Sequence, residues 1–130
     1  MKRRSVAPTA ALLVAAAWSL AGVPNAFAAD ESVVVIARYF ITPGREAEAE
    51  PRLQKALEFM RKAEPTHSFR FHRSLKDPSV YLFYEVYPSQ AALDEHRRVT
   101  NPARAKELGP TPPGLLARPP EIEEFRLIDH

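Results

Sequence analysis

Cysteine is absent from this chain, and tryptophan, methionine and glycine are scarce, with one, two and four copies respectively. Without cysteine the chain can form no disulfide, no lipoprotein attachment site and no thiolate metal site, so the fold must be stable by packing alone. Long apolar runs are also lacking. The longest, at residues 10–21, is about a dozen residues and falls short of the ~20 that span a bilayer.

The first residues have the three parts of a secretory signal. Lys2, Arg3 and Arg4 precede the apolar stretch, and Ala26-Phe27-Ala28 follows a Pro-Asn turn. This pattern predicts a cleavable signal peptide over residues 1–28 and a periplasmic or secreted mature domain over residues 29–130, with no membrane anchor after cleavage. The arginine pair also occurs in twin-arginine signals, but the apolar residues that should follow it are missing, so ordinary secretion is favoured.

An excess of charge of one sign is missing from the mature chain. The full sequence has 18 basic and 16 acidic residues, and cleavage of the signal would remove three basic ones. The net charge of the mature chain is then near zero, and basic and acidic residues are interspersed. This pattern provides no basic surface for binding nucleic acid or anionic lipid. No glycine-rich phosphate loop and no cluster of metal ligands occurs either, so we predict neither a cofactor nor a metal.

The order of the predicted elements is strand, helix, strand, strand, helix, strand. Alternating or β-branched runs predict strands over residues 33–41, 67–74, 80–87 and 122–128. Helical periodicity predicts helices over residues 45–62 and 89–108, with Ser89 as the N-cap of the second. Pro51 indicates either a kink in the first helix or a helix that begins near Glu50. Residues 109–120 contain five prolines and are predicted to be a largely extended loop.

This order is that of an α+β fold of the ferredoxin-like type, in which one antiparallel sheet carries two helices on one face. Both faces of the first and third strands are nevertheless apolar. A strand that is apolar on both faces is buried on both faces. We therefore expect a homodimer in which the uncovered sheet faces pack against each other.

Several short segments follow one another in a distinctive order: Ile36-Ala37-Arg38-Tyr39-Phe40, Pro43-Gly44, Glu64-Pro65, His72-Arg73-Ser74-Leu75-Lys76-Asp77-Pro78, Tyr84-Glu85-Val86-Tyr87, Ser89-Gln90-Ala91-Ala92-Leu93 and His96. In this order and spacing, over about residues 33–128, the chain resembles the antibiotic biosynthesis monooxygenase domain family. The resemblance implies a dimeric α+β barrel. It does not imply one particular reaction.

The family includes cofactor-independent quinol monooxygenases and haem-degrading oxygenases. Haem-degrading members would be expected to have asparagine, tryptophan and histidine at positions that here are Ala37, Tyr87 and Lys106. The chain is therefore more similar to the quinol monooxygenase branch. It departs from that branch at Thr66, where glycine is usual, and at Tyr87, where tryptophan is usual.

Oxygenation without a metal or flavin requires an electron-rich substrate, such as a hydroquinone, together with a base and a dry pocket. His96 is the first candidate for the base, because it follows Leu93 by three residues on the apolar side of the second helix and should point at the sheet. Imidazole can accept a phenolic proton near neutral pH. The alternative is a structural histidine, either hydrogen-bonded or at the helix edge.

Glu85 is the second candidate, since a carboxylate in the most apolar strand is costly unless it is paired. Arg38 on the first strand is its predicted partner, in a buried ion pair that either serves catalysis by stabilising anionic charge or holds strands in register. Three residues of the second strand, His67, Arg70 and His72, are candidates for contact with the substrate. In an alternating strand, His67 points to the opposite face from the other two.

Tyr39 and Tyr87 could stack on an aromatic substrate, although such aromatics are more often part of a core. Leu115 and Leu116 lie between prolines, and the loop that carries them is a lid, an arm on a partner subunit or a plain connector. The predicted function is oxygenation of a small hydroquinone or phenol with O2. The alternative is a non-enzymatic module of the same fold that binds a small molecule or acts in a stress response.

Overall fold

The computed structural model describes residues 31–128, so the predicted signal peptide lies outside the described residues. The elements run in the order β1 (Val33–Ile41), α1 (Glu46–Ala63), β2 (Ser68–Arg73), β3 (Val80–Tyr87), α2 (Gln90–Glu95), the π-helical turn η2 (His96–Thr100), α3 (Asn101–Leu108) and β4 (Leu116–Arg126). No helix within residues 31–128 is both long enough and apolar enough to cross a membrane.

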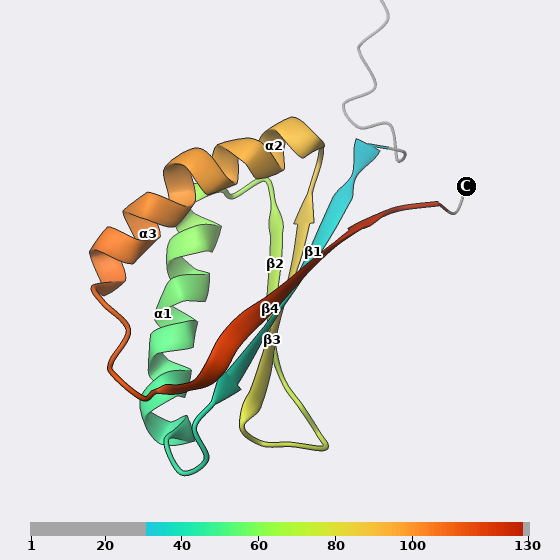
Figure 1. The fold of residues 1–130 in the computed structure, drawn as a ribbon. Helices are drawn as coiled ribbons and strands as arrows, with labels where there is room; N and C mark the ends of the chain where they lie inside the picture. The colour runs from blue at the N-terminus through green and yellow to red at the C-terminus, as the bar shows by residue number, and fades with distance from the viewer. Residues whose placement is uncertain (1–30, 129–130) are drawn as a thin grey trace, which may run out of the picture.

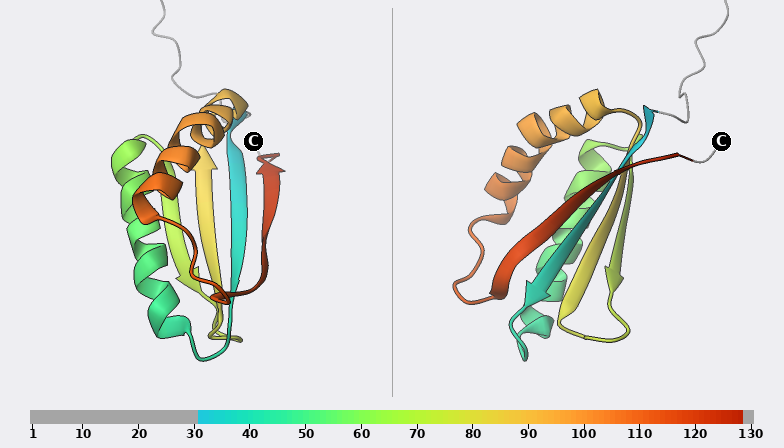
Figure 2. Two further views of the ribbon diagram at one scale, coloured as in Figure 1. Left: turned by 60° about the vertical axis from the view of Figure 1, so that its left-hand side comes forward. Right: turned by 45° about the vertical axis from the view of Figure 1, so that its right-hand side comes forward.

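The four strands form one antiparallel sheet in the order β2-β3-β1-β4. Figures 1 and 2 show α1 and the continuous α2–α3 segment on one side of this sheet, while the other side is open. The ferredoxin-like fold predicted from the order of elements is therefore confirmed. The sheet does not close into a barrel within one chain, since β2 and β4 are its two free edges.

The core lies between the sheet and the helices. Helix α1 buries an apolar stripe, which comprises Ala49, Leu53, Ala56, Leu57 and Met60. Pro51 lies inside this helix, which begins at Glu46, so the alternative start near Glu50 is wrong. The sheet contributes its odd-numbered residues on β1 and β3, among them the fully buried Tyr81, Phe83 and Tyr87.

The segment after β3 is one helical run with a wide turn in its middle. Ser89 caps it as predicted, because its side chain accepts a hydrogen bond from the backbone N–H of Ala92. At η2 the N–H of Asn101 bonds the carbonyl of His96, five residues back. Pro102 follows directly and has no N–H to continue an α-helical ladder. Such π turns often occur at functional sites.

Strand β4 is longer than predicted, because it begins at Leu116 and includes Pro119 and Pro120. Proline is tolerated in an edge strand, where its missing N–H can face solvent. The pairing of β4 with β1 also shifts register between Arg38 and Ile41, which is where the proline-containing part of the strand begins. The extended loop is therefore limited to residues 109–115.

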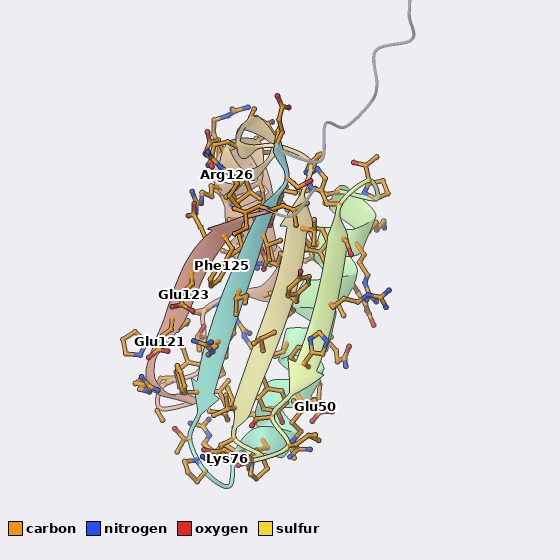
Figure 3. The ribbon with its side chains drawn as sticks, turned by 90° about the vertical axis from the view of Figure 1, so that its right-hand side faces the viewer. Glu50, Lys76, Glu121, Glu123, Phe125 and Arg126 are labelled. Atoms are coloured by element: carbon orange, nitrogen blue, oxygen red, sulfur yellow. The ribbon has the colours of Figure 1, made fainter. Side chains whose placement is uncertain are left out.

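The open face of the sheet is charged at its edges and, apart from Arg38 on β1, apolar at its centre. Its central side chains come from β1 and β3 and include Val34, Ile36, Phe40, Leu82, Tyr84 and Val86. Figure 3 looks onto this face and shows Glu121 and Glu123 along β4 at one edge. Arg70 and His72 lie along β2 at the other edge.

Candidate functional site

A buried histidine–carboxylate pair joins α2–α3 to the end of α1. His96 is 3% exposed, and its Nδ1 atom lies 2.6 Å from Oε2 of Glu64. Glu64 caps the end of α1 and donates its backbone N–H to the carbonyl of Met60. The helical position of His96 and the end of α1 thus bring the two side chains together. Since Nδ1 is held by the carboxylate, Nε2 is the ring nitrogen left free to act elsewhere.

Glu85 and Tyr87 form a second buried pair beside the first. The Tyr87 hydroxyl donates to Oε2 of Glu85 at 2.6 Å, and both residues point toward the helices. The Tyr87 ring lies edge-on to His96, with ring centroids 5.1 Å apart. His67 packs against the same tyrosine at 5.3 Å, and its Nδ1 lies 3.6 Å from Glu64 without a hydrogen bond.

A cavity of roughly 90 Å³ opens next to these pairs, between the sheet and the α2–α3 segment. We call it the polar cavity. It is lined by Val35, Ala37, Tyr39, Glu85, Leu93, His96, Arg97, Asn101, Arg104 and Ile122. The side-chain oxygen of Asn101 is buried and has no hydrogen-bond partner among the described residues. A buried polar atom of this kind costs free energy unless a ligand or water satisfies it.

A second cavity, of roughly 170 Å³, adjoins the first and is here called the apolar cavity. Tyr39 and Arg104 line both cavities, so the two share a wall. The rest of the apolar cavity is formed by Ile41, Ala49, Arg52, Leu53, Ala56, Phe83, Ala105, Leu108, Gly109, Thr111, Leu115 and Leu116. An apolar cavity that adjoins a few polar groups is the usual form of a small-molecule site.

The loop of residues 109–115 closes one side of the apolar cavity. Leu115 is 2% exposed, and its carbonyl accepts from the backbone N–H of Thr42 at 2.9 Å. Arg45 donates to the carbonyl of Pro113, which fixes the loop against the start of α1. Figure 2 shows this connection running from the end of α3 to the start of β4. The loop is therefore a wall of the cavity, as the lid interpretation requires.

Two tyrosines near the cavities have raised pKa values. Burial, followed by the charge and the hydrogen bond of Glu85, raises the pKa of Tyr87 far above its ordinary value. Burial also raises the pKa of Tyr39, where the positive charge of Arg104 acts in the opposite direction. Both phenols therefore stay protonated at neutral pH and can donate hydrogen bonds.

The family model for antibiotic biosynthesis monooxygenases matches residues 32–107 of this chain. The chain belongs to this family. A relative from Synechocystis sp., the uncharacterized protein sll1783, is 28% identical over 101 residues, which cover 78% of this chain and 67% of that protein. The resemblance inferred from the sequence motifs is thereby confirmed. The quinol branch within the family is not specified by this match.

Solved structures share the fold. Rv0793 from Mycobacterium tuberculosis superposes with a TM-score of 0.60 at 26% identity, covering 76% of this chain and 97% of that one. A conserved protein from Methanosarcina mazei gives a TM-score of 0.63 at 21% identity, covering 75% and 94%. A candidate antibiotic biosynthesis monooxygenase from Caulobacter crescentus gives 0.62 at 24%, covering 77% and 92%. Family and fold together indicate a monooxygenase-like or small-molecule-binding module.

Five of the eight predicted site residues gather on the helix side of the sheet in this member of the family. They are His96, Glu85, Tyr87, Tyr39 and His67. The other three, Arg38, Arg70 and His72, lie on the open face around a shallow depression. The two groups are therefore separated by the thickness of the sheet.

The predicted ion pair between Arg38 and Glu85 is wrong. In the β1–β3 register Glu85 is opposite Val35, whereas Arg38 is opposite Leu82. Because side chains alternate between faces, this offset of three residues puts the two charges on opposite sides of the sheet. Arg38 pairs with Glu123 at 3.2 Å on the open face, while Glu85 is satisfied by Tyr87.

Sequence reasoning missed three residues of the site: Glu64, Asn101 and Arg104. In the sequence, Glu64 was recognised only as part of the Glu64-Pro65 segment of the family pattern. Asn101 and Arg104 lie in α3, which directly follows the π-helical turn η2. Helical spacing offered a signal for Arg104, because it follows His96 by eight residues and therefore lies on the same face of a continuous helix.

Proposed function

We propose that this chain is an exported monooxygenase that oxidises a small hydroquinone or phenol with O2 and without a cofactor. The observation that carries the proposal is the placement of His96. Its Nδ1 is held by Glu64 at 2.6 Å while its ring lines the polar cavity. A histidine oriented by a buried carboxylate is a general base in the arrangement that catalysis needs.

The proposed reaction converts a hydroquinone and O2 into a hydroxyquinone and water. Nε2 of His96 takes one phenolic proton, and the resulting phenolate passes an electron to O2. The two radicals combine to form a carbon–oxygen bond at an unsubstituted ring carbon. Loss of the proton from that carbon and cleavage of the O–O bond then give the carbonyl, while the distal oxygen leaves as water. The substrate supplies every electron, so no other reductant is required.

Two tyrosines near His96 shape the site. The Tyr87 ring packs on His96 and limits its movement. Tyr39, whose phenol stays protonated, can donate a hydrogen bond to a bound oxygen atom. Arg38 has no part in this proposal, because it lies on the open face with Glu121 and Glu123.

We also propose a homodimer formed through the open sheet faces, as expected from the sequence. The apolar side chains at the centre of this face would be exposed to water in a monomer, and an exposed apolar patch of this kind marks an interaction surface. Within the described residues, Arg70 and His72 on β2 have no carboxylate at ion-pair distance. Glu121 and Glu123, which share Arg38 within the chain, lie on β4 at the opposite edge. A two-fold related copy that places β2 over the partner β4 would join these opposite charges.

Export remains a proposal that rests on residues 1–28. It is checked by fractionating cells that make the full chain and by determining the N-terminal residue of the recovered protein. A product that begins near residue 29 in the periplasm or the medium supports the proposal. Uncleaved protein confined to the cytoplasm contradicts it.

The reaction is tested by oxygen uptake with chelator-treated protein on a panel of hydroquinones. We expect uptake above autoxidation with a matching yield of hydroxyquinone. His96→Gln should lower the rate by about 100-fold or more, since a positioned base contributes about that much. Arg98→Gln, an exposed change on the same helical segment, should not. A folded protein that gives no uptake but melts at a higher temperature with a hydroquinone would instead support the binding-module alternative.

A further inference from the structure

The apolar cavity has two arginines in its walls and no carboxylate. Arg52 enters from α1 and Arg104 from α3, while the other lining residues are apolar or uncharged. Neither arginine has a carboxylate within ion-pair distance in the part of the chain that the structure describes. Two positive charges thus border an apolar space that has no negative charge of its own.

Arg104 is half-buried between the two helices and the sheet. Its hydrogen-bond contact is Nη1 to the thioether of Met60 at 3.3 Å, and sulfur of this kind is a weak acceptor. Glu85 is the one carboxylate among the residues that line the polar cavity, but it does not line the apolar cavity and is bonded to Tyr87. The side of Arg104 that faces the apolar cavity therefore lacks an anion.

The guanidinium group of Arg52 forms its hydrogen bonds with neutral backbone carbonyls. Its two terminal nitrogens donate to the backbone carbonyls of Leu108 and Gly109, at 2.9 and 2.5 Å. Glu48 and Glu107 lie with Arg52 along the outer groove between α1 and α3, and neither is close enough to form an ion pair with it. These hydrogen bonds fix the guanidinium at the end of α3 without neutralising its charge.

A partly buried cation without a counter-charge is unfavourable, and a ligand that supplies the charge would gain most from this site. We propose that the apolar cavity binds a small aromatic carboxylate. Its carboxylate pairs with Arg104, in the field of Arg52, and its ring packs against Leu53, Phe83 and Leu115. This deepens the proposed function, on which it rests for the identity of the ligand as substrate: the hydroquinone that is oxidised carries an acidic group. Arg104 holds that group at the boundary between the apolar cavity and the polar cavity that His96 lines.

Binding can be measured without any turnover. Naphthoate and naphthamide have nearly the same shape, but only naphthoate is charged, and neither is a hydroquinone. Isothermal titration of the full protein should show naphthoate binding at least about tenfold more tightly than naphthamide. Arg104→Gln should remove this preference, Arg104→Lys should keep part of it, and Arg98→Gln should leave it unchanged. Equal affinities for the two ligands, or a preference that survives Arg104→Gln, would overturn the proposal.

A second measurement separates this proposal from the reaction. Oxygen uptake is compared for gentisate, a hydroquinone with a carboxylate, and methylhydroquinone, which has none. Selective naphthoate binding without uptake of oxygen on either compound would keep the anion site and overturn the monooxygenase. Uptake that favours methylhydroquinone, with no naphthoate preference, would keep the reaction and overturn the anion site. Both proposals require faster uptake with gentisate.

Discussion

Nδ1 of His96 lies 2.6 Å from Oε2 of Glu64, and both side chains are buried. The pair connects two elements that are 32 residues apart in the sequence. A carboxylate in this position fixes the orientation of the imidazole ring and stabilises the imidazolium that forms when the other nitrogen takes a proton. In the proposed reaction, Glu64 therefore acts through His96 and is a positioning residue.

Replacement of Glu64 by glutamine tests this role. The amide keeps the size of the side chain but cannot stabilise a developing imidazolium, so kcat should fall by at least about tenfold while KM stays within about twofold. Steady-state oxygen uptake measures both constants. Glu58→Gln, an exposed change on the same helix, is the control. If KM rises and kcat is unchanged, Glu64 serves binding and not proton transfer.

The hydrogen bond from Tyr87 to Glu85 should be important for stability. Tyr87→Phe leaves a buried carboxylate without its donor, which costs about 1.5–3 kcal/mol of unfolding free energy. Urea denaturation at neutral pH measures the loss. Tyr81→Phe is the matched control, since the Tyr81 hydroxyl donates to Glu50, whose side chain is 43% exposed to water. Changing both partners, as Glu85→Leu with Tyr87→Phe, should recover part of the stability because no unpaired charge remains.

The raised pKa of Tyr87 predicts that the folded protein loses stability in alkali. The pKa of Tyr87 is raised in the folded state, from an ordinary value of 10.0, by burial and by Glu85. Above pH 10 the unfolded chain loses this phenolic proton while the folded chain keeps it. The folded state then binds more protons, so the unfolding free energy should fall by about 1.4 kcal/mol per pH unit from this group. Below pH 10 the contribution is constant.

Urea denaturation at a series of pH values between about 8 and 11 checks this sign. The Tyr87→Phe protein should lose stability less steeply above pH 10 than the unmodified protein does. The remaining slope would come from other buried phenols, of which Tyr39 is one. Identical slopes in the two proteins would show that the environment of Tyr87 does not hold its proton.

The open sheet face predicts a dimer that a single charge should disrupt. Ile36 lies at the centre of this face, opposite Tyr84. Ile36→Lys would bury a lysine from each copy without a partner, so the dissociation constant should rise by about 100-fold or more. Sedimentation over a range of protein concentrations measures it. Val99→Lys, on the exposed side of the helical layer, should remain dimeric. A monomeric unmodified protein would contradict the dimer proposal itself.

Much of this fold could be predicted from the sequence because the periodic signals are strong. The alternation in β3 and the stripe of α1 recur in the structure with the predicted faces, and Ser89 caps the second helical run as expected. The end of the chain was harder to predict. Pro119 and Pro120 suggested a loop, yet an edge strand can include them because only one side of its backbone is paired.

The candidate site was predicted only in part. His96 and Glu85 were recognised because a polar residue in an apolar pattern stands out. Their partners were not, since contacts such as His96 with Glu64 depend on how α1 packs against the second helical run. The Arg38–Glu85 prediction failed for a related reason. The register of β1 against β3 decides the face on which each side chain lies, and no turn between these two strands fixes it, because α1 and β2 lie between them in the sequence.

Leu115 provides the last prediction, because it is a cavity wall in a segment without regular structure. Its side chain is 2% exposed, whereas that of Leu75, at the β2–β3 turn, is fully exposed. Leu115→Ala should cost about 2–3 kcal/mol of unfolding free energy, and Leu75→Ala should change it by less than about 0.5 kcal/mol. The Leu115→Ala protein should also bind bulkier aromatic acids than the unmodified protein, since the apolar cavity is enlarged. Denaturation and titration measure the two effects separately. A loss of stability without any change in ligand size preference would mean that Leu115 anchors the loop but does not border the bound ligand.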